Sequence, residues 1–149
     1  MKPMRWVSLL VVALTLVRGA DAQDPTSDAV TASKIRQAET AATRWLALVD
    51  SGRYAASWDA AAAVFRTQIT QAQWQAAATA AREQVNPLGA RRRLNAQYAL
   101  ELPDAPPGEY VVIQYSTPAR DNVRVVETLA LMLETPGTWR VIGYFIRPE

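Results

Sequence analysis

The chain has 149 residues, enough for one domain that buries roughly two-thirds of the surface of its unfolded form. It contains no cysteine and no histidine, which excludes disulfide bonds, imidazole-based catalytic triads and imidazole metal ligands. We expect no metal and no cofactor, since zinc held by carboxylates alone is unusual. Sixteen basic and fourteen acidic side chains give a formal net charge of +2.

The first 22 residues have the three-part pattern of a secretory signal peptide. Lys2 and Arg5 give a positive start, residues 7–17 are apolar, and small residues lead up to Ala22. We expect cleavage between Ala22 and Gln23, which predicts a periplasmic or secreted protein. The apolar run is shorter than the ~20 residues of a membrane-spanning helix, so we expect no stable membrane span after cleavage. An uncleaved segment that tethers the domain to the inner membrane is the alternative.

Cleavage would also change the charge balance, because thirteen basic and thirteen acidic side chains follow residue 22. A formally neutral mature chain gives no electrostatic reason to bind nucleic acid or a membrane surface. No phosphate-binding loop or nucleic-acid motif occurs in the sequence either. We therefore expect no nucleic-acid partner.

The mature chain begins with a polar, proline-containing stretch, residues 23–32, which we expect to be a flexible lead-in. A single domain over residues 33–149 should follow. From Ser33, apolar residues recur every three or four positions, which predicts a helix that Ser33 caps and Gly52 ends. A second helix is expected over residues 54–65, with Tyr54 and Phe65 on one face.

The third predicted helix has the clearest start signal in the chain. Thr70 and Gln73 match a capping box, and the NPLG run at residues 86–89 should stop the helix. Tryptophans recur at helical and strand spacings through the domain, which favours a place in the core over a binding pocket; they are Trp45, Trp58, Trp74 and Trp139.

After Gly89 the apolar period falls to two, which is typical of strands. We expect strands over residues 94–102, 109–117, 123–134 and 139–147. Short connections between them imply an antiparallel meander, because parallel neighbours need long crossovers. The sequence therefore predicts an α+β domain in which three helices cover one face of a four-stranded sheet.

Several segments of this domain also resemble a known bacterial family, domain of unknown function 4019. The segments are residues 45–59 (WLALVDSGRYAASWD), 87–89 (PLG), 106–115 (PPGEYVVIQY), 127–129 (ETL) and 139–146 (WRVIGYFI). The resemblance spans residues 38–146 and implies an exported bacterial protein. It also implies a cone-like architecture similar to the nuclear transport factor two-like superfamily, but no established reaction and no catalytic residues.

Glu127 is the first candidate for a functional side chain, because it falls in phase with the apolar residues of the third strand. A buried carboxylate there is either a pocket acid or a paired structural group. If a three-residue loop closes the last hairpin, Glu127 lies opposite Arg147 and Glu134 lies opposite Arg140. Two opposite-charge pairs of this kind favour the structural interpretation.

Asp59 is a second candidate, because enzymes with the cone-like fold sometimes place a carboxylate in this helix. An aspartate base and a tyrosine donor can move a proton beside a carbonyl without histidine, and Tyr144 is one available donor. The structural alternative, which we favour, is a surface residue or a partner of a nearby arginine, Arg44 or Arg53.

Arg91, Arg92 and Arg93 form the third candidate group. They could gather an anionic ligand or partner, but three arginines at the start of a strand more often form a solvated edge. Our leading hypothesis is thus an exported, non-catalytic module that binds a small apolar ligand or pairs with a second copy through its sheet. The alternative is an isomerase- or dehydratase-like enzyme with Asp59 or Glu127 as base and a tyrosine as donor.

Overall fold

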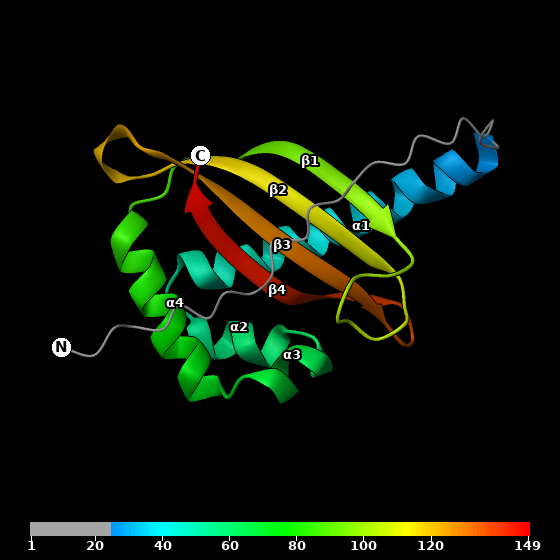
Figure 1. Ribbon diagram of the computed structural model, residues 1–149, viewed down its shortest axis with the longest axis horizontal. Helices are drawn as coiled ribbons and strands as arrows, with labels where there is room; N and C mark the ends of the chain where they lie inside the picture. Colours follow the sequence, from blue (N-terminus) through cyan, green and yellow to red (C-terminus); the bar gives the residue numbers. More distant parts are fainter. Residues whose placement is uncertain (1–24) are drawn as a thin grey trace.

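Residues 25–149 are the part of the chain that the structure, a computed structural model, describes, and in them helices precede strands (Figure 1). The helices are α1 (Pro25–Asp50), α2 (Tyr54–Ala60), α3 (Ala63–Gln68) and α4 (Gln71–Val85). The strands are β1 (Arg92–Ala99), β2 (Tyr110–Pro118), β3 (Arg124–Glu134) and β4 (Thr138–Pro148), with a 3-10 turn, η1 (Arg120–Asn122), between β2 and β3. None of these helices combines the length and apolarity needed to cross a membrane.

The strands form one antiparallel sheet in the order β1-β2-β3-β4, which confirms the predicted α+β meander. Figure 1 shows α1 crossing one face of this sheet, with α2, α3 and α4 gathered beside β4. Helix α1 contacts every strand, and α2 packs between α1 and α4. The helical layer therefore rests on the sheet mainly through α1.

The first helix begins earlier than expected. Residues 25–32, expected to be a flexible lead-in, form the first turns of α1 instead, and Ser33 lies inside the helix rather than at its cap. Proline suits the first position of a helix, and Asp28 lies in the first turn, where a negative charge is favourable. The predicted end is confirmed, since Gly52 follows the helix with a φ of +71°.

The second predicted helix is two helices, so the expected count of three is wrong. The chain is extended at Ala61 and Ala62, between α2 and α3. There the backbone N–H of Ala62 donates to Val141 O at 2.9 Å, and that of Ala63 donates to Glu134 Oε1 at 2.6 Å. Partners from the last hairpin thus replace helical hydrogen bonds, a contact that no local pattern can indicate.

Helix α4 begins as predicted. The side chain of Thr70 accepts from Gln73 N and the side chain of Gln73 accepts from Thr70 N, which completes the capping box. The helix ends at Val85, immediately before the NPLG run. Local sequence signals therefore determine both ends of this helix.

Aromatic side chains fill the core between the helices, as predicted from their spacing. The ring of Trp74 lies between those of Trp45 and Phe65, at centroid distances of 5.8 and 5.2 Å. Ser57 satisfies both indole N–H groups, since its O accepts from Trp45 at 2.8 Å and its Oγ accepts from Trp74 at 2.9 Å. Trp58 is only half-buried, while Trp139 is buried with the others.

Two irregularities displace the expected strand phases. A register shift between Arg93 and Asn95 leaves Leu94 exposed, and β1 ends at Ala99, before the exposed Leu100. In the last hairpin the turn comprises residues 135–137, one position earlier than expected, and a second shift lies between Ala130 and Leu131, so that Ile146, not Arg147, is opposite Glu127. The predicted Glu127–Arg147 pair is therefore wrong.

The second charge pair expected in the last hairpin, between Glu134 and Arg140, does form. Arg140 Nε lies 3.2 Å from Glu134 Oε2. However, Arg140 is opposite Met132 and Glu134 is opposite Thr138, so the two side chains meet diagonally rather than face to face. The Glu134–Arg140 ion pair was predicted correctly, but the register of β3 against β4 was not.

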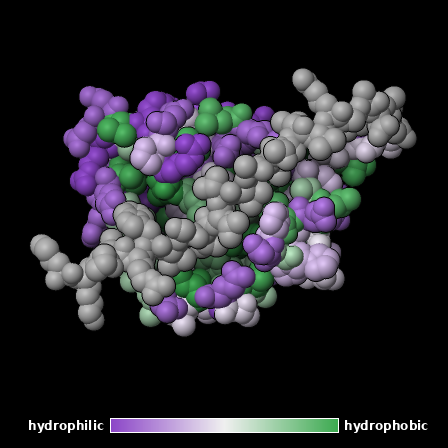
Figure 2. Space-filling view, viewed as in Figure 1, coloured by the Kyte–Doolittle hydropathy of each residue, from purple (hydrophilic) through white to green (hydrophobic). Residues whose placement is uncertain are grey.

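Hydrophilic side chains gather at the end of the sheet where η1 joins β2 to β3 (Figure 2). Arg120 of this turn reaches α4, where its Nε donates to Gln84 O at 2.8 Å. The loop after α4 also contacts this end, because the N–H of Gly89 donates to Pro118 O at 2.7 Å. A Cβ at Gly89 would lie 3.1 Å from Pro118 Cβ, so glycine permits this close approach.

Candidate functional site

A cluster of charged and polar side chains lies where α1, α4 and the sheet meet. Its centre is Glu127 of β3, whose side chain is completely buried. Oε2 accepts from Arg91 Nε at 2.7 Å and from Thr117 Oγ1 at 2.6 Å. Oε1 accepts from Tyr144 OH at 2.5 Å and from Arg91 Nη2 at 3.0 Å. Both carboxylate oxygens are thus occupied by protein donors.

Arg91 links this carboxylate to a second one, Asp50, at the end of α1. Its Nη1 donates to Asp50 Oδ2 at 2.7 Å, and its Nη2 donates to Asp50 Oδ1 at 2.8 Å. Arg82 of α4 donates from Nη2 to the same Oδ1 at 2.7 Å and from Nε to Asn86 Oδ1 at 3.2 Å. We call this group the Glu127 network; it comprises Asp50, Arg82, Arg91, Thr117, Glu127 and Tyr144.

The network contains two guanidinium groups and two carboxylates, so its formal charges cancel. Burial alone would raise the pKa of Asp50, but hydrogen bonds from Arg91 and Arg82 outweigh it and hold that pKa below its ordinary value. Burial opposes the charge of Arg91, yet its hydrogen bonds to Asp50 and Glu127 raise its pKa. Burial, together with the charge of Glu127, raises the pKa of Tyr144. At neutral pH the two arginines are therefore charged and the phenol holds its proton.

This arrangement joins α1, α4, the loop before β1 and three strands through polar contacts. It offers no free base, because each oxygen of Glu127 and of Asp50 already accepts from an arginine. A cavity of about 480 Å³ borders Asp50, Arg82 and Arg91, but these side chains are committed to one another. The geometry indicates a structural clamp rather than a reactive centre.

The structure agrees with some of the expectations for the candidate residues and contradicts others. Glu127 is paired, as the structural interpretation required, but with Arg91 in place of Arg147. Tyr144 contacts Glu127, whereas Asp59 lies on the exposed surface of α2 and accepts from Gln71 Nε2 at 3.1 Å. Asp59 is thus a surface residue, one of its two structural alternatives, and within residues 25–149 it forms no ion pair with Arg44 or Arg53. Only two of the three candidates for proton transfer therefore come together.

The arginine run is divided among three environments. Arg91 belongs to the Glu127 network, so a solvated edge is the wrong interpretation for this residue. Arg92 is exposed, as a solvated edge requires. Arg93 forms an ion pair with Glu39 of α1. Alternation along the strand directs Arg92 away from its two neighbours, whose side chains reach carboxylates of α1 and β3.

Sequence reasoning missed Arg82 and interpreted Asp50 only as part of the end of a helix. A signal for Arg82 was present, since it follows Trp74 and Ala78 at four-residue steps and so shares their buried face. An arginine in an otherwise small and apolar stripe requires a buried acceptor. Nothing local to the sequence indicates that Asp50 is that acceptor.

The raised pKa of Tyr144 predicts a loss of stability in alkali. The folded state holds the phenol proton more strongly than the unfolded chain, whose tyrosine pKa is about 10. This contribution is complete below about pH 10 and is lost as the pH rises towards the folded-state pKa. The free energy of unfolding, measured by urea titration at a series of pH values, should fall above about pH 10 and should fall less steeply in Tyr144→Phe. Parallel declines in the two proteins would contradict the assignment.

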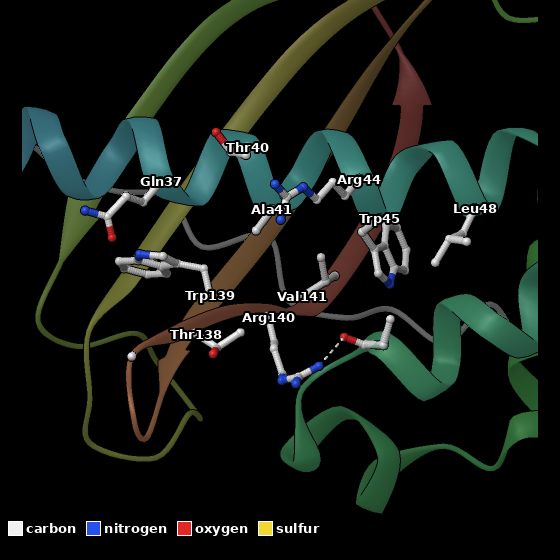
Figure 3. A pocket seen from close by; sticks show the side chains of 12 residues that line it. Gln37, Thr40, Ala41, Arg44, Trp45, Leu48, Thr138, Trp139, Arg140 and Val141 are labelled. Carbon is white, nitrogen blue, oxygen red and sulfur yellow. Dashed lines mark hydrogen bonds between the residues drawn. The ribbon is translucent and has the colours of Figure 1, made fainter.

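A second feature is a groove of about 360 Å³ between α1 and the start of β4 (Figure 3). In Figure 3, α1 forms one wall, and β4 with the turn before it forms the other. Its apolar lining comes from three segments far apart in the sequence: Ala41, Trp45 and Leu48 of α1, Ala60 of α2, and Trp139 and Val141 of β4. The groove thus depends entirely on the packing of α1 against the last strand.

Trp139 has an unusual position in this groove. Its side chain is only 6% exposed, yet among the described residues no atom accepts a hydrogen bond from its indole Nε1. In Figure 3 this nitrogen lies on the edge of the ring that faces α1. The other described tryptophans all donate to oxygen atoms of the protein. A buried N–H without a partner costs roughly 1–3 kcal/mol, so an acceptor supplied from outside would be favourable.

The polar lining of the groove is basic. Arg44 and Arg140 both border it, and none of its lining residues carries a carboxylate. Arg140 is engaged, since it pairs with Glu134 and donates from Nη1 to Ala60 O at 3.2 Å, the dashed line in Figure 3. Arg44 is exposed and forms no ion pair within residues 25–149. The groove therefore combines an apolar base with one uncommitted cation.

Comparison with known proteins places this fold in a family. The family model described as Protein of unknown function (DUF4019) matches residues 41–144. The chain belongs to the DUF4019 family. The matched span includes every member of the Glu127 network and most of the lining of the groove. No curated protein and no solved structure gave a match to the chain.

Proposed function

We propose that this DUF4019 protein is an exported, non-catalytic module that binds a small, largely apolar ligand in the groove between α1 and β4. The observation that carries this proposal is the unpaired indole N–H of Trp139, which is buried in the wall of that groove. Pockets for small molecules have volumes of about 300–1,000 Å³, apolar walls and a few polar groups that orient the ligand. A groove of about 360 Å³ lined by two tryptophans fits this description.

The charged residues favour binding over catalysis. A general base needs an oxygen that is free to take a proton from substrate. The oxygens of Glu127 accept from Arg91, Thr117 and Tyr144, and Asp59 lies on the exposed surface of α2. An isomerase or dehydratase mechanism through either carboxylate is therefore not part of our proposal. The cone-like likeness and pairing with a second copy through the sheet stay predictions.

The groove is tested with phenylnaphthylamine, a neutral apolar dye whose emission rises in apolar sites. The purified protein should bind it saturably, and Thr40→Trp, which places a large ring at the mouth of the groove, should abolish binding. Thr43→Trp is the matched control, because both threonines are exposed on α1 and donate to the carbonyl four residues earlier, at 3.0 and 2.9 Å. Equal effects of the two substitutions, or no saturable binding, would contradict the proposal.

Export is the second part of the proposal, and it rests on the sequence of residues 1–22 and on the family resemblance. The cleavage site between Ala22 and Gln23 lies outside the described residues. Intact-mass measurement of the protein recovered from the periplasm should give the mass of residues 23–149. Recovery of the full chain in the membrane fraction would support the tethered alternative instead.

A further inference from the structure

We propose that the ligand of the groove is an amphiphilic anion, with an apolar body, a negatively charged head and an oxygen acceptor for the indole N–H of Trp139. This inference rests on the proposed function and specifies its ligand class. It commits to a small molecule with a carboxylate- or sulfonate-type head.

The charge follows from the lining of the groove. Arg44 and Arg140 border it without any lining carboxylate, so the local field favours an anion. Arg140 already has Glu134 as its partner, which leaves Arg44 as the cation available to a ligand. In Figure 3 the side chain of Arg44 runs along α1 towards Ala41, another lining residue of the groove.

The indole N–H of Trp139 is the reason to expect a hydrogen-bond acceptor on the ligand. Three other indoles in the described residues donate to oxygens, at 2.8 Å from Trp45, 2.8 Å from Trp58 and 2.9 Å from Trp74. Trp139 is as deeply buried as Trp74, at 6% exposed, but its N–H has no described acceptor. An indole nitrogen can only donate, so the missing partner must be an acceptor such as an oxygen.

The apolar body follows from the apolar lining of the groove. In Figure 3 Ala41 of α1 lies across the groove from Val141 of β4, and Trp45 and Leu48 extend the apolar lining along α1. A fully polar anion, such as inorganic phosphate or acetate, would leave these surfaces uncovered. The chemistry of the site thus favours an anion that also carries apolar area.

The test compares two dyes that share one ring system. Anilinonaphthalene sulfonate carries a sulfonate, and phenylnaphthylamine carries no charge. We expect the sulfonate to bind about two- to fivefold more tightly, the range for an ion pair with an exposed arginine. Added salt should weaken binding of the sulfonate and leave binding of the neutral dye unchanged.

Arg44→Gln should remove the preference for the sulfonate and leave the affinity for the neutral dye unchanged. Arg36→Gln is the matched control, because Arg36 is an exposed arginine of the same helix that does not line the groove. If the sulfonate binds no more tightly than the neutral dye, or if Arg44→Gln leaves the preference intact, the inference is overturned while the groove function stands. If neither dye binds in a way that Thr40→Trp blocks, the proposed function fails as well.

Nuclear magnetic resonance tests the acceptor separately. The indole ¹H–¹⁵N signal of Trp139, assigned from its absence in Trp139→Phe, should move on titration with anilinonaphthalene sulfonate. The signals of Trp45, Trp58 and Trp74 should move less, because their N–H groups already have acceptors. An unmoved Trp139 signal at saturation would overturn the role given to this N–H.

Discussion

Replacing Arg91 by alanine is expected to destabilise the fold by about 3–5 kcal/mol, the cost of leaving a buried charge without its partner. Glu127 is completely buried, and within residues 25–149 Arg91 is its only cationic partner. Asp50 would also lose two of the three hydrogen bonds that its carboxylate accepts from arginines. Urea-induced unfolding monitored by tryptophan fluorescence measures the change.

Arg92→Ala is the matched control, because Arg92 is the next residue in the chain and is exposed. Its substitution should change the free energy of unfolding by no more than about 0.5 kcal/mol. Adding Glu127→Gln to Arg91→Ala should recover part of the loss, since the buried negative charge is then gone. Similar losses in the free energy of unfolding from Arg91→Ala and Arg92→Ala would refute the stabilising role of the Glu127 network.

Trp74→Ala is expected to cost about 3–5 kcal/mol, because it opens a cavity between α2, α4 and the end of α1. The indole is 6% exposed, packs against Trp45 and Phe65, and donates to Ser57 Oγ. Thermal unfolding followed by circular dichroism should show the largest fall in melting temperature among single helix-layer substitutions.

Ser57→Ala separates packing from hydrogen bonding at this site. It leaves the indole ring in place but removes the acceptor of the Trp74 N–H, which should cost about 1–3 kcal/mol. Ser51→Ala is its control, because Ser51 is exposed and should cost no more than about 0.5 kcal/mol. A loss from Ser57→Ala equal to that from Trp74→Ala would mean that packing of the ring contributes little.

The burial of Glu127 could be predicted from the sequence, but the partner of its carboxylate could not. Phase along β3 correctly placed Glu127 among buried residues, because strand alternation is a local property. Its partner could not be predicted, because the residue of β4 opposite Glu127 depends on the position of the turn as well as on a shift in register between Ala130 and Leu131, and the true partner, Arg91, lies in the loop before β1. Register shifts of this kind depend on packing against other elements rather than on local composition.

The arginine run also shows that local composition cannot predict the tertiary partners of a side chain. Arg91, Arg92 and Arg93 are identical in type and adjacent in sequence, yet one is part of a buried network, one is exposed and one pairs with α1. Local composition gives all three the same expectation. Their distinction comes from carboxylates on α1 and β3, more than thirty residues away in the chain.

The sequence by itself determined the end of α1, the capping of α4, the four strands with their antiparallel meander, and the family, because these follow from local periodicity, turn residues and motifs. Only the tertiary structure decided that Ala61 and Ala62 break a helix, that Arg91 and Arg82 share Asp50, and that Trp139 borders a groove with its N–H unpaired. Each of these depends on a contact between separate elements: the α2–α3 link with the last hairpin, the end of α1 with α4 and the loop before β1, and β4 with α1. Such contacts arise when separate elements pack, so they leave no pattern in any one stretch of the chain.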